Sequence, residues 1–557
     1  MRALRNRPHR RGRAVAAALA AAFLVVSCAA DEGDGTAAQG PTGDPVRGGA
    51  AAVAVHQEPS CFDIHVSPQD ITGSIQRNVF DSLVAEDAQG NFHPWLATSW
   101  DVAADLKTFT FKLRTDVKFT DGTVFDAAAV KANFDHIVAK TTKSQYAASL
   151  LGGAAYAGTE VVDPTTVKVA FNKPFAPFLQ AASTAYLGFY SPKTLAADAD
   201  KLCTGGPHLV GTGPFKFAAY TKGQDLTLEN NPAYNWAPKT AKHQGPAYLD
   251  KLTYRFLKED AVRVGALTSG QVDAAVSVPP VNTKAVEASG IRILRRDFAG
   301  AAYGLYFNTT RAPFDDERVR KAIQRGIDIG TNVEAIYFGQ YKRAWSPIGP
   351  ATPSYAATLD NSWPYDPAYA GKLLDEAGWS GRDGDGYRTK DGKRLTVTWP
   401  ASPSSNREQR DVLSQAIQAD LKKIGVEVQR PALDVGTYTT NAYKGIYDVL
   451  DVSWARFEPD VLRLYFHSSN LPSVSGQNAA WLTNPEIDKW TDDAAATLDK
   501  ATRDKLYAQT QAWVVEHAVG IPVYSATALL GVAKHIQGIE YDPNAWPLLY
   551  DAWTTRR

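Results

Sequence analysis

The chain has 557 residues, of which 44% are hydrophobic and 21% are charged, and 59 Lys and Arg residues balance 59 Asp and Glu residues. A chain of this length can bury more than one hydrophobic core, so we expect more than one lobe. The zero formal net charge argues against a nucleic acid as the main partner, because nucleic-acid-binding proteins carry an excess of positive charge.

The N-terminal segment resembles an export signal. Six Arg residues between positions 2 and 13 precede an apolar run at residues 14–26, which is too short to span a membrane comfortably. The run ends in Val-Val-Ser-Cys, which resembles a bacterial lipobox, where cleavage precedes a lipid-modified Cys. We therefore expect a signal peptide at residues 1–27 and a lipid on Cys28; the alternative is an ordinary signal peptide with an incidental Cys. Residues 28–48 contain few large apolar side chains and are expected to form a flexible tether.

Apart from Cys28, the sequence contains Cys61 and Cys203. It has no C-x-x-C motif, so neither a zinc site nor a redox dithiol is indicated. In an oxidising compartment, two such cysteines most simply form a disulfide. Two separate buried thiols remain the alternative.

A strand, a turn and a helix are predicted in succession around residues 94–138. Residues 108–113 alternate between polar and apolar, as in a half-buried strand. Asp121 and Gly122 form a turn dipeptide. Asp126 can cap an Ala-rich helix, in which Val130, Phe134 and Val138 share one face.

This stretch resembles the signature of the family 5 extracytoplasmic solute-binding proteins, the receptors that feed peptide, nickel and related ABC importers. The family pattern reads roughly P-x-L-A-x-S-W, t-F-x-L-R and k-F-x-D-G, followed by a capped helix. The matching residues are Pro94, Leu96, Ala97, Ser99, Trp100, Phe109, Phe111, Leu113, Arg114, Lys118, Phe119, Asp121 and Gly122. Asp126 stands where the family usually has a Thr cap. Further landmarks lie at residues 211–215, 228–234 and 303–309, so the resemblance runs from about residue 49 to the end.

Elsewhere, helical spacing at residues 75–84 predicts a helix, and strands alternate with helices between residues 366 and 428, including a helix at 407–424. This alternation indicates an α/β lobe. The resemblance implies an α/β fold of the type II periplasmic-binding class, with two hinge-closing lobes and an extra subdomain. The expected limits are 49–78, 206–300 and 531–557 for the first lobe, 79–205 for its inserted subdomain, and 301–530 for the second lobe.

The motifs that could indicate chemistry are weak. The sequence has no G-x-S-x-G and no H-E-x-x-H. Asp383 and Asp385 resemble the start of a calcium loop, but Arg394 occupies the twelfth position, where a carboxylate is needed. Since nothing assembles a nucleophile, a base and an oxyanion donor, we expect no enzyme activity, no metal and no cofactor. A surface enzyme that processes peptides is the alternative from a different class.

The candidate ligand site lies at residues 453–460. In the family, the preceding strand end lines the cleft and its Trp, here Trp454, stacks on the ligand. The other candidates that the resemblance suggests are Arg456, Glu458, Asp451, Tyr303 and Glu58.

The charges at this site depart from those of the peptide receptors. Those receptors carry an Asp after the Trp that pairs with the peptide amino terminus, whereas this chain has Arg456. Oligopeptide receptors carry an Arg just before the Trp, and Asp451 stands near that place. We therefore predict that Arg456 recognises acidic groups; the alternative is a surface ion pair of Arg456 with Glu458.

Together these features predict a lipid-anchored, monomeric receptor on the extracytoplasmic face of the bacterial cell membrane. It would capture a peptide or a similar small, polar or charged nutrient between two lobes and deliver it to ABC permease subunits. Metal–chelator complexes, opines and oligosaccharides are alternative ligands within the same family.

Overall fold

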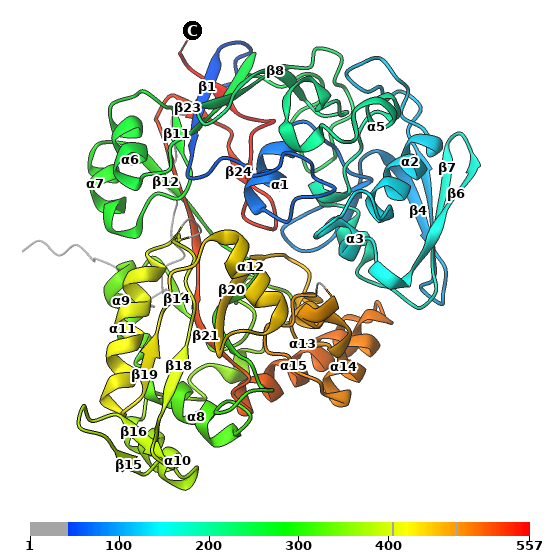
Figure 1. Ribbon diagram of the computed structural model, residues 1–557. Coiled ribbons are helices and arrows are strands. Elements are labelled where there is room, and N and C mark those ends of the chain that lie inside the picture. Colours follow the sequence, from blue (N-terminus) through cyan, green and yellow to red (C-terminus); the bar gives the residue numbers. More distant parts are fainter. Residues whose placement is uncertain (1–42, 404–405, 475, 557) are drawn as a thin grey trace, which may run out of the picture. The chain divides into compact units, whose positions relative to one another are not determined.

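The computed structural model describes residues 43–403, 406–474 and 476–556 (Figure 1). The predicted signal peptide, Cys28 and nearly all of the predicted tether lie outside these residues. Within the described ranges, no helix combines the length and apolar character that crossing a membrane requires. Nor does that part of the chain gather three or more His, Cys, Asp or Glu side chains that could hold a metal ion.

The first-lobe sheet has seven strands in the described part of the chain, and the N-terminal strand β1 lies inside it between two parallel neighbours. In spatial order the strands are β12 (Arg292–Asp297), β22 (Thr527–Val532), β11 (Ala274–Ala275), β1 (Ala50–Val55), β10 (Lys251–Phe256), β9 (Asp225–Asn230) and β8 (Phe215–Thr221). Helix α6 (Asp260–Thr268) contacts β1 and β11, and α7 (Thr283–Ala288) contacts β12.

The insert sheet is antiparallel and lies within the predicted subdomain. Its described strands, in spatial order, are β4 (Ala97–Val102), β5 (Thr108–Leu113), β7 (Thr166–Phe171) and β6 (Tyr156–Asp163). The predicted strand at 108–113 therefore has its expected bounds, and the Asp126 side chain caps α2 (Ala127–Val138) by accepting a hydrogen bond from the Ala129 N–H. Val130 and Phe134 are fully buried, but Val138, at the last turn of the helix, is 39% exposed.

The second-lobe sheet is built from strands of distant sequence. Its described strands, in spatial order, are β14 (Lys342–Arg343), β21 (Gly520–Ser525), β13 (Gly300–Phe307) and β20 (Val449–Ala455). Two further strands, β18 (Thr396–Thr398) and β19 (Glu427–Gln429), form a separate parallel pair. The helix α11 (Arg410–Lys423) connects them in the sequence. All eight residues of β13 are buried, as expected for a strand covered on both faces.

The remaining elements complete the lobes (Figure 1). The other helices are α1 (Asp70–Gln76), α3 (Ala147–Leu150), α4 (Phe178–Ala181), α5 (Pro192–Asp198), α8 (Glu317–Gly326), α9 (Ile329–Tyr337), α10 (Pro367–Glu376), α12 (Val435–Lys444), α13 (Val461–Phe466), α14 (Pro485–Ala495) and α15 (Lys500–Glu516). The other strands are β2 (Val84–Glu86), β3 (Phe92–Pro94), β15 (Gly381–Arg382), β16 (Arg388–Lys390), β17 (Lys393–Arg394), β23 (Ile536–Gln537), β24 (Glu540–Tyr541), β25 (Pro547–Leu548) and β26 (Trp553–Thr554).

Two details of the predicted elements are wrong. The helix expected at residues 75–84 is instead α1 (Asp70–Gln76), which ends as the chain passes into a buried loop. The helix expected from residue 407 begins at Arg410, because Glu408 and Gln409 adopt left-handed backbone angles, with φ of 55° and 52°. Residues other than glycine rarely adopt such backbone angles, and those that do often lie at functional sites.

The chain passes between the first-lobe and second-lobe sheets at two neighbouring points. One crossing joins β12 to β13, and another joins β21 to β22. The Phe298 N–H donates a hydrogen bond to the Ala526 carbonyl oxygen at 3.0 Å, so the crossings run side by side. The predicted limits of the lobes stay a prediction, to which the strand pairing adds that β22 joins the first-lobe sheet from Thr527 onwards.

Candidate functional site

Strand β20 presents two different surfaces around the predicted site residues. Successive side chains on a strand point to opposite faces, so Asp451 and Ser453 share one face while Trp454 lies on the other. The strand pairs antiparallel with β13, which carries Tyr303. The predicted residues of the second lobe are therefore brought together by two adjacent strands.

Trp454 forms an aromatic contact between the insert and the second lobe. Its ring centroid lies 4.5 Å from that of Tyr146 in the insert, with an interplanar angle of 31°. Tyr146 in turn meets Tyr186 edge-on at 4.9 Å, and Tyr465 of α13 meets Trp454 edge-on at 6.4 Å. The Trp that the family resemblance indicated thus lies against aromatic side chains from both parts of the chain.

Arg456 follows β20 and is anchored to a crossing segment by its backbone. Its N–H donates to the Ala299 carbonyl oxygen at 3.0 Å. The close approach requires glycine at position 300, where φ is 109° and a Cβ would lie 2.2 Å from the Trp454 carbonyl oxygen. The Arg456 backbone is therefore held firmly where the lobes join.

Arg456 is 3% exposed, and its Nε is buried without a hydrogen-bond partner. Across the described ranges, the guanidinium forms no ion pair and no hydrogen bond with another side chain. A buried charge without a partner is energetically unfavourable, so this position is expected to attract an acidic group.

Glu458 does not neutralise Arg456. Its carboxylate pairs with the Arg503 guanidinium on α15, and its side chain is 7% exposed. The surface pair between Arg456 and Glu458 that the sequence left open is therefore not formed.

Asp451 organises the other face of β20. The Tyr303 hydroxyl donates to Asp451 Oδ2 at 3.0 Å, and the Trp399 Nε1–H donates to Oδ1 at 2.7 Å. Burial and the Asp451 charge raise the pKa of Tyr303, so its hydroxyl keeps the proton that it donates. The Arg430 guanidinium stacks on the Trp399 ring, 3.8 Å from Cζ to the centroid.

A second network joins the start of α11 to the same face of β20. Arg410 donates to Ser453 Oγ at 2.7 Å and to Glu408 Oε2 at 2.8 Å, and its Cζ lies 4.3 Å from the Tyr303 ring centroid. The Tyr524 hydroxyl donates to the same Glu408 oxygen at 2.5 Å. Although burial opposes ionisation, the charges of Arg410 and Arg407 lower the pKa of Glu408 to about 2. Glu408 is therefore ionised and offsets Arg410.

Near this network, the first lobe contributes two titratable side chains whose pKa values are shifted in favour of their neutral forms. Burial raises the pKa of Asp70, the first residue of α1, to about 7, even though Arg407 lowers it. Asp70 Oδ1 is buried and finds no hydrogen-bond partner among the described residues. Burial, Arg263 and Arg407 lower the pKa of His56, which follows β1, to about 4. Near neutral pH the Asp70 carboxyl is therefore only partly ionised, and the His56 imidazole is uncharged.

Glu58 has different partners from the other predicted residues. It accepts hydrogen bonds from the Tyr220 hydroxyl at 2.6 Å and from the Gly223 N–H at 2.9 Å, at the β8–β9 hairpin. In the described part of the chain, it makes no hydrogen bond or ion pair to another predicted site residue. Its role in binding stays a prediction.

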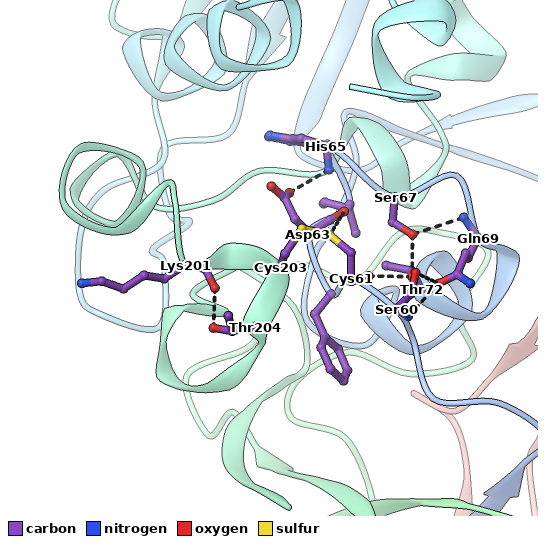
Figure 2. Close-up of a disulfide and its surroundings, with 12 residues drawn as sticks. Ser60, Cys61, Asp63, His65, Ser67, Gln69, Thr72, Lys201, Cys203 and Thr204 are labelled. Carbon is purple, nitrogen blue, oxygen red and sulfur yellow. Dashed lines mark hydrogen bonds between the residues drawn. A yellow bond between two sulfur atoms is a disulfide. The ribbon is translucent and has the colours of Figure 1, made fainter. Parts of the chain in front are cut away.

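Cys61 and Cys203 form a disulfide near the end of the predicted insert (Figure 2). Their Cα atoms are 4.2 Å apart, and they are separated by 142 positions in sequence. The adjacent Phe62 N–H donates to the Cys203 carbonyl oxygen at 3.1 Å, and the Thr72 hydroxyl of α1 donates to the Cys61 carbonyl oxygen at 2.9 Å. The bond thus ties the loop before α1 to the end of the inserted subdomain.

The residues that sequence reasoning missed are Trp399, Arg407, Glu408, Arg410, Arg430 and Asp70. Trp399 directly follows β18, and a large aromatic at a strand end was a usable signal. The arginines gave none, because their position depends on contacts between distant segments.

Comparison with known proteins decides the family. The model for "Bacterial extracellular solute-binding proteins, family 5 Middle" matches residues 91–471. The chain belongs to this family. The predicted family is therefore confirmed.

The alignments with relatives and with solved structures extend over about nine tenths of this family 5 protein. The glutathione-binding protein GsiB of Escherichia coli K12 is 27% identical over 504 residues, covering 88% of this chain and 92% of GsiB. Brucella suis NikA, solved in complex with Fe(III)-EDTA, has a TM-score of 0.78 and 25% identity, covering 91% of this chain and all of NikA. Bacillus subtilis AppA, solved with a nonapeptide, has a TM-score of 0.80 and 24% identity, covering 92% of this chain and all of AppA. These similarities confirm the predicted fold class, a two-lobed α/β periplasmic-binding fold.

Proposed function

We propose that this family 5 protein is the substrate-binding component of an ABC importer. It binds a peptide or a similar small, charged nutrient between its lobes outside the cytoplasm and delivers it to permease subunits. Membership of a family of extracellular solute-binding proteins supports this function, as do relatives named for glutathione and peptide binding.

The observation that carries the proposed ligand chemistry is the buried guanidinium of Arg456. Arg456 stands where peptide receptors place an acidic residue, and within the described residues it has no acidic partner. A guanidinium offers a planar, always charged fork to a carboxylate, and exclusion of water between the lobes strengthens that contact. We infer that an acidic group of the ligand binds Arg456 while Trp454 provides a stacking wall.

Asp451 and Tyr303 lie on the face of β20 opposite Trp454 and would act indirectly by fixing Trp399, as Glu458 would by orienting Arg503. Among the alternative ligands, metal–chelator complexes and opines carry carboxylates and suit Arg456, whereas neutral oligosaccharides do not. The protein is proposed to act as a monomer, anchored by a lipid on Cys28 at the outer face of the cell membrane.

The test is native mass spectrometry of protein purified from its own host, followed by calorimetry with the molecule that is recovered. We expect one bound solute per chain, release without chemical change, and at least about tenfold weaker binding by Arg456→Gln. Arg255→Gln, at an exposed position of β10, is the matched control. Turnover of the recovered solute would instead favour a peptide-processing enzyme.

A further inference from the structure

Three buried polar atoms near Trp454 have no hydrogen-bond partner among the residues that the structure describes. They are Oδ1 of Asp70, the hydroxyl oxygen of Tyr465 and Nε of Arg456. Tyr465 and Arg456 are only 2% and 3% exposed. Buried polar groups in folded proteins are nearly always hydrogen-bonded, so three unsatisfied groups in one region indicate that another molecule binds between them.

Aromatic contacts bring these atoms into one site. The ring centroids of Tyr146 and Tyr465 lie 4.5 Å and 6.4 Å from that of Trp454. Burial raises the pKa of Tyr146 to about 12, the Arg456 charge lowers it and the Asp70 charge raises it, so both charged groups lie near the Tyr146 hydroxyl. Burial also raises the pKa of Tyr465, and Tyr146 and Asp70 add to that effect. Asp70, Tyr465 and Arg456 therefore share Tyr146 as a neighbour.

Asp70 also contacts the backbone between Trp454 and Arg456. Strand β20 lies at the edge of the second-lobe sheet among the described strands. The Arg456 N–H donates to the Ala299 carbonyl oxygen on the β13 side, so the neighbouring Ala455 N–H points to the free edge. Burial raises the pKa of Asp70, and a hydrogen bond from the Ala455 N–H is among the effects that lower it. The first-lobe carboxyl is therefore in contact with the strand that positions Trp454 and Arg456.

The charges that face Asp70 do not neutralise it. After burial, the largest effect on its pKa is that of Arg407, which lowers it, while Glu408 and Asp542 raise it. Arg407 is 41% exposed and lies 3.5 Å from the ionised Glu408 carboxylate, so it is not a partner of Asp70 alone. In the described ranges, Asp70 forms no ion pair with Arg407 or with Arg456. A cation that reaches Asp70 therefore finds a carboxyl without a counter-ion.

We propose that Asp70 binds the ammonium group of a zwitterionic solute whose carboxylate binds Arg456, beside the Trp454 ring. An ordered water would satisfy the Tyr465 hydroxyl but would leave the buried guanidinium without a counter-charge. The peptide receptors of the family carry an Asp after the Trp for the peptide amino terminus, and in this chain the first lobe supplies a carboxyl instead. This inference rests on the proposed function and narrows its ligand class.

The two charged residues come from different lobes. Asp70 is the first residue of α1 in the first lobe, and Arg456 follows β20 in the second lobe. A solute with both charges binds to both lobes at once and favours their closed arrangement, whereas a solute with one charge gains only one of these contacts. The protein should therefore prefer a zwitterion to either singly charged form of the same molecule.

The test uses synthetic probes with one to four Ala residues and separately removable charges. Unmodified (Ala)n is the zwitterion, acetyl-(Ala)n lacks the ammonium group, and (Ala)n amide lacks the carboxylate. Calorimetry at pH 7 compares the wild type with Asp70→Asn and Arg456→Gln. Asp101→Asn and Arg255→Gln, at exposed positions of β4 and β10, are the matched controls, and thermal unfolding checks that each variant is folded.

We expect the wild type and both controls to bind the zwitterion of one length at least about tenfold more tightly than its acetylated form or its amide. Asp70→Asn should lose the preference over the acetylated form and keep the preference over the amide, and Arg456→Gln should do the reverse.

A folded Asp70→Asn variant that keeps the preference over the acetylated form overturns the inference. So does a wild type that prefers the zwitterion at no length of the series. A solute recovered from the host protein that carries no basic group also overturns it but leaves the receptor function intact, whereas turnover of the solute overturns the proposed function.

Discussion

Replacing Arg456 by Gln should make the ligand-free protein more stable while it weakens ligand binding. Arg456 is 3% exposed, and its guanidinium has no ion-pair partner in the described structure. Its uncompensated burial costs several kcal/mol at most. Gln is shorter, and the lost apolar contact costs about 1 kcal/mol. The net expectation is a gain of about 2 kcal/mol in the free energy of unfolding.

The same substitution removes a charged donor from the ligand. A hydrogen bond to a charged group contributes about 1.5–3 kcal/mol, so affinity should fall at least about tenfold. The assay is urea unfolding of protein refolded without its solute, followed by calorimetry with the solute added back.

Arg463→Gln is the control, because Arg463 is an arginine that is only 13% exposed and does have a partner. Arg463 donates to Asp460 at 2.7 and 3.0 Å, and the Asp460 side chain is 0% exposed. Removing Arg463 leaves that carboxylate with fewer donors, so the control should lose at least about 2 kcal/mol. If Arg456→Gln also lost stability and kept full affinity, Arg456 would be a structural residue and the reasoning would be refuted.

Three further predictions concern the disulfide, a buried acid and the lipid anchor. Replacing Cys61 and Cys203 by Ala opens a loop of 142 positions and should lower the free energy of unfolding by about 5 kcal/mol in the chain-entropy model; two free thiols in mass spectra of non-reduced protein would contradict this. Burial raises the pKa of Asp70 from 3.8 to about 7. Between these two values the folded protein holds a proton on Asp70 that the unfolded chain has lost, so the free energy of unfolding falls as the pH rises from about 4 to about 7. Asp70→Asn should therefore match the wild type at pH 4 and unfold at a higher temperature at pH 8, whereas the exposed control Asp101→Asn should shift neither value. Cys28→Ala should release the protein or leave an uncleaved precursor, and unchanged processing with membrane attachment would rule out the anchor.

Local patterns were sufficient where the chain interacts mainly with its near neighbours. The alternation at residues 108–113 gives the bounds of β5, and Asp126 caps α2 as its position predicted. The helix predicted at residues 75–84 was wrong because Val79, Phe80 and Leu83 are all fully buried. Apolar side chains surrounded on every side need not follow one helix face, so their spacing carried no information about the backbone.

The candidate site was partly predictable, through Trp454, Arg456, Asp451 and Tyr303. The sequence showed that Arg456 replaces an acidic residue, but the pairing of Glu458 with Arg503 depends on α15. The stack of Arg430 on Trp399 likewise joins segments that meet in the folded protein. The left-handed backbone at Glu408 could not be predicted from helix propensity. It accompanies long-range contacts, because the Glu408 carboxylate accepts hydrogen bonds from Arg410 and Tyr524.

The place of β1 within the first-lobe sheet governs the order in which the protein can fold. Ala54 pairs with Ala275, and Ala275 pairs with Gly531, so the earliest strand to be synthesised belongs to a sheet that needs one of the last. Contacts between such distant residues form slowly, because a long loop must close before they contribute any stability. During synthesis the first-lobe sheet therefore stays incomplete until the second lobe has been made, because β22 follows that lobe in the sequence.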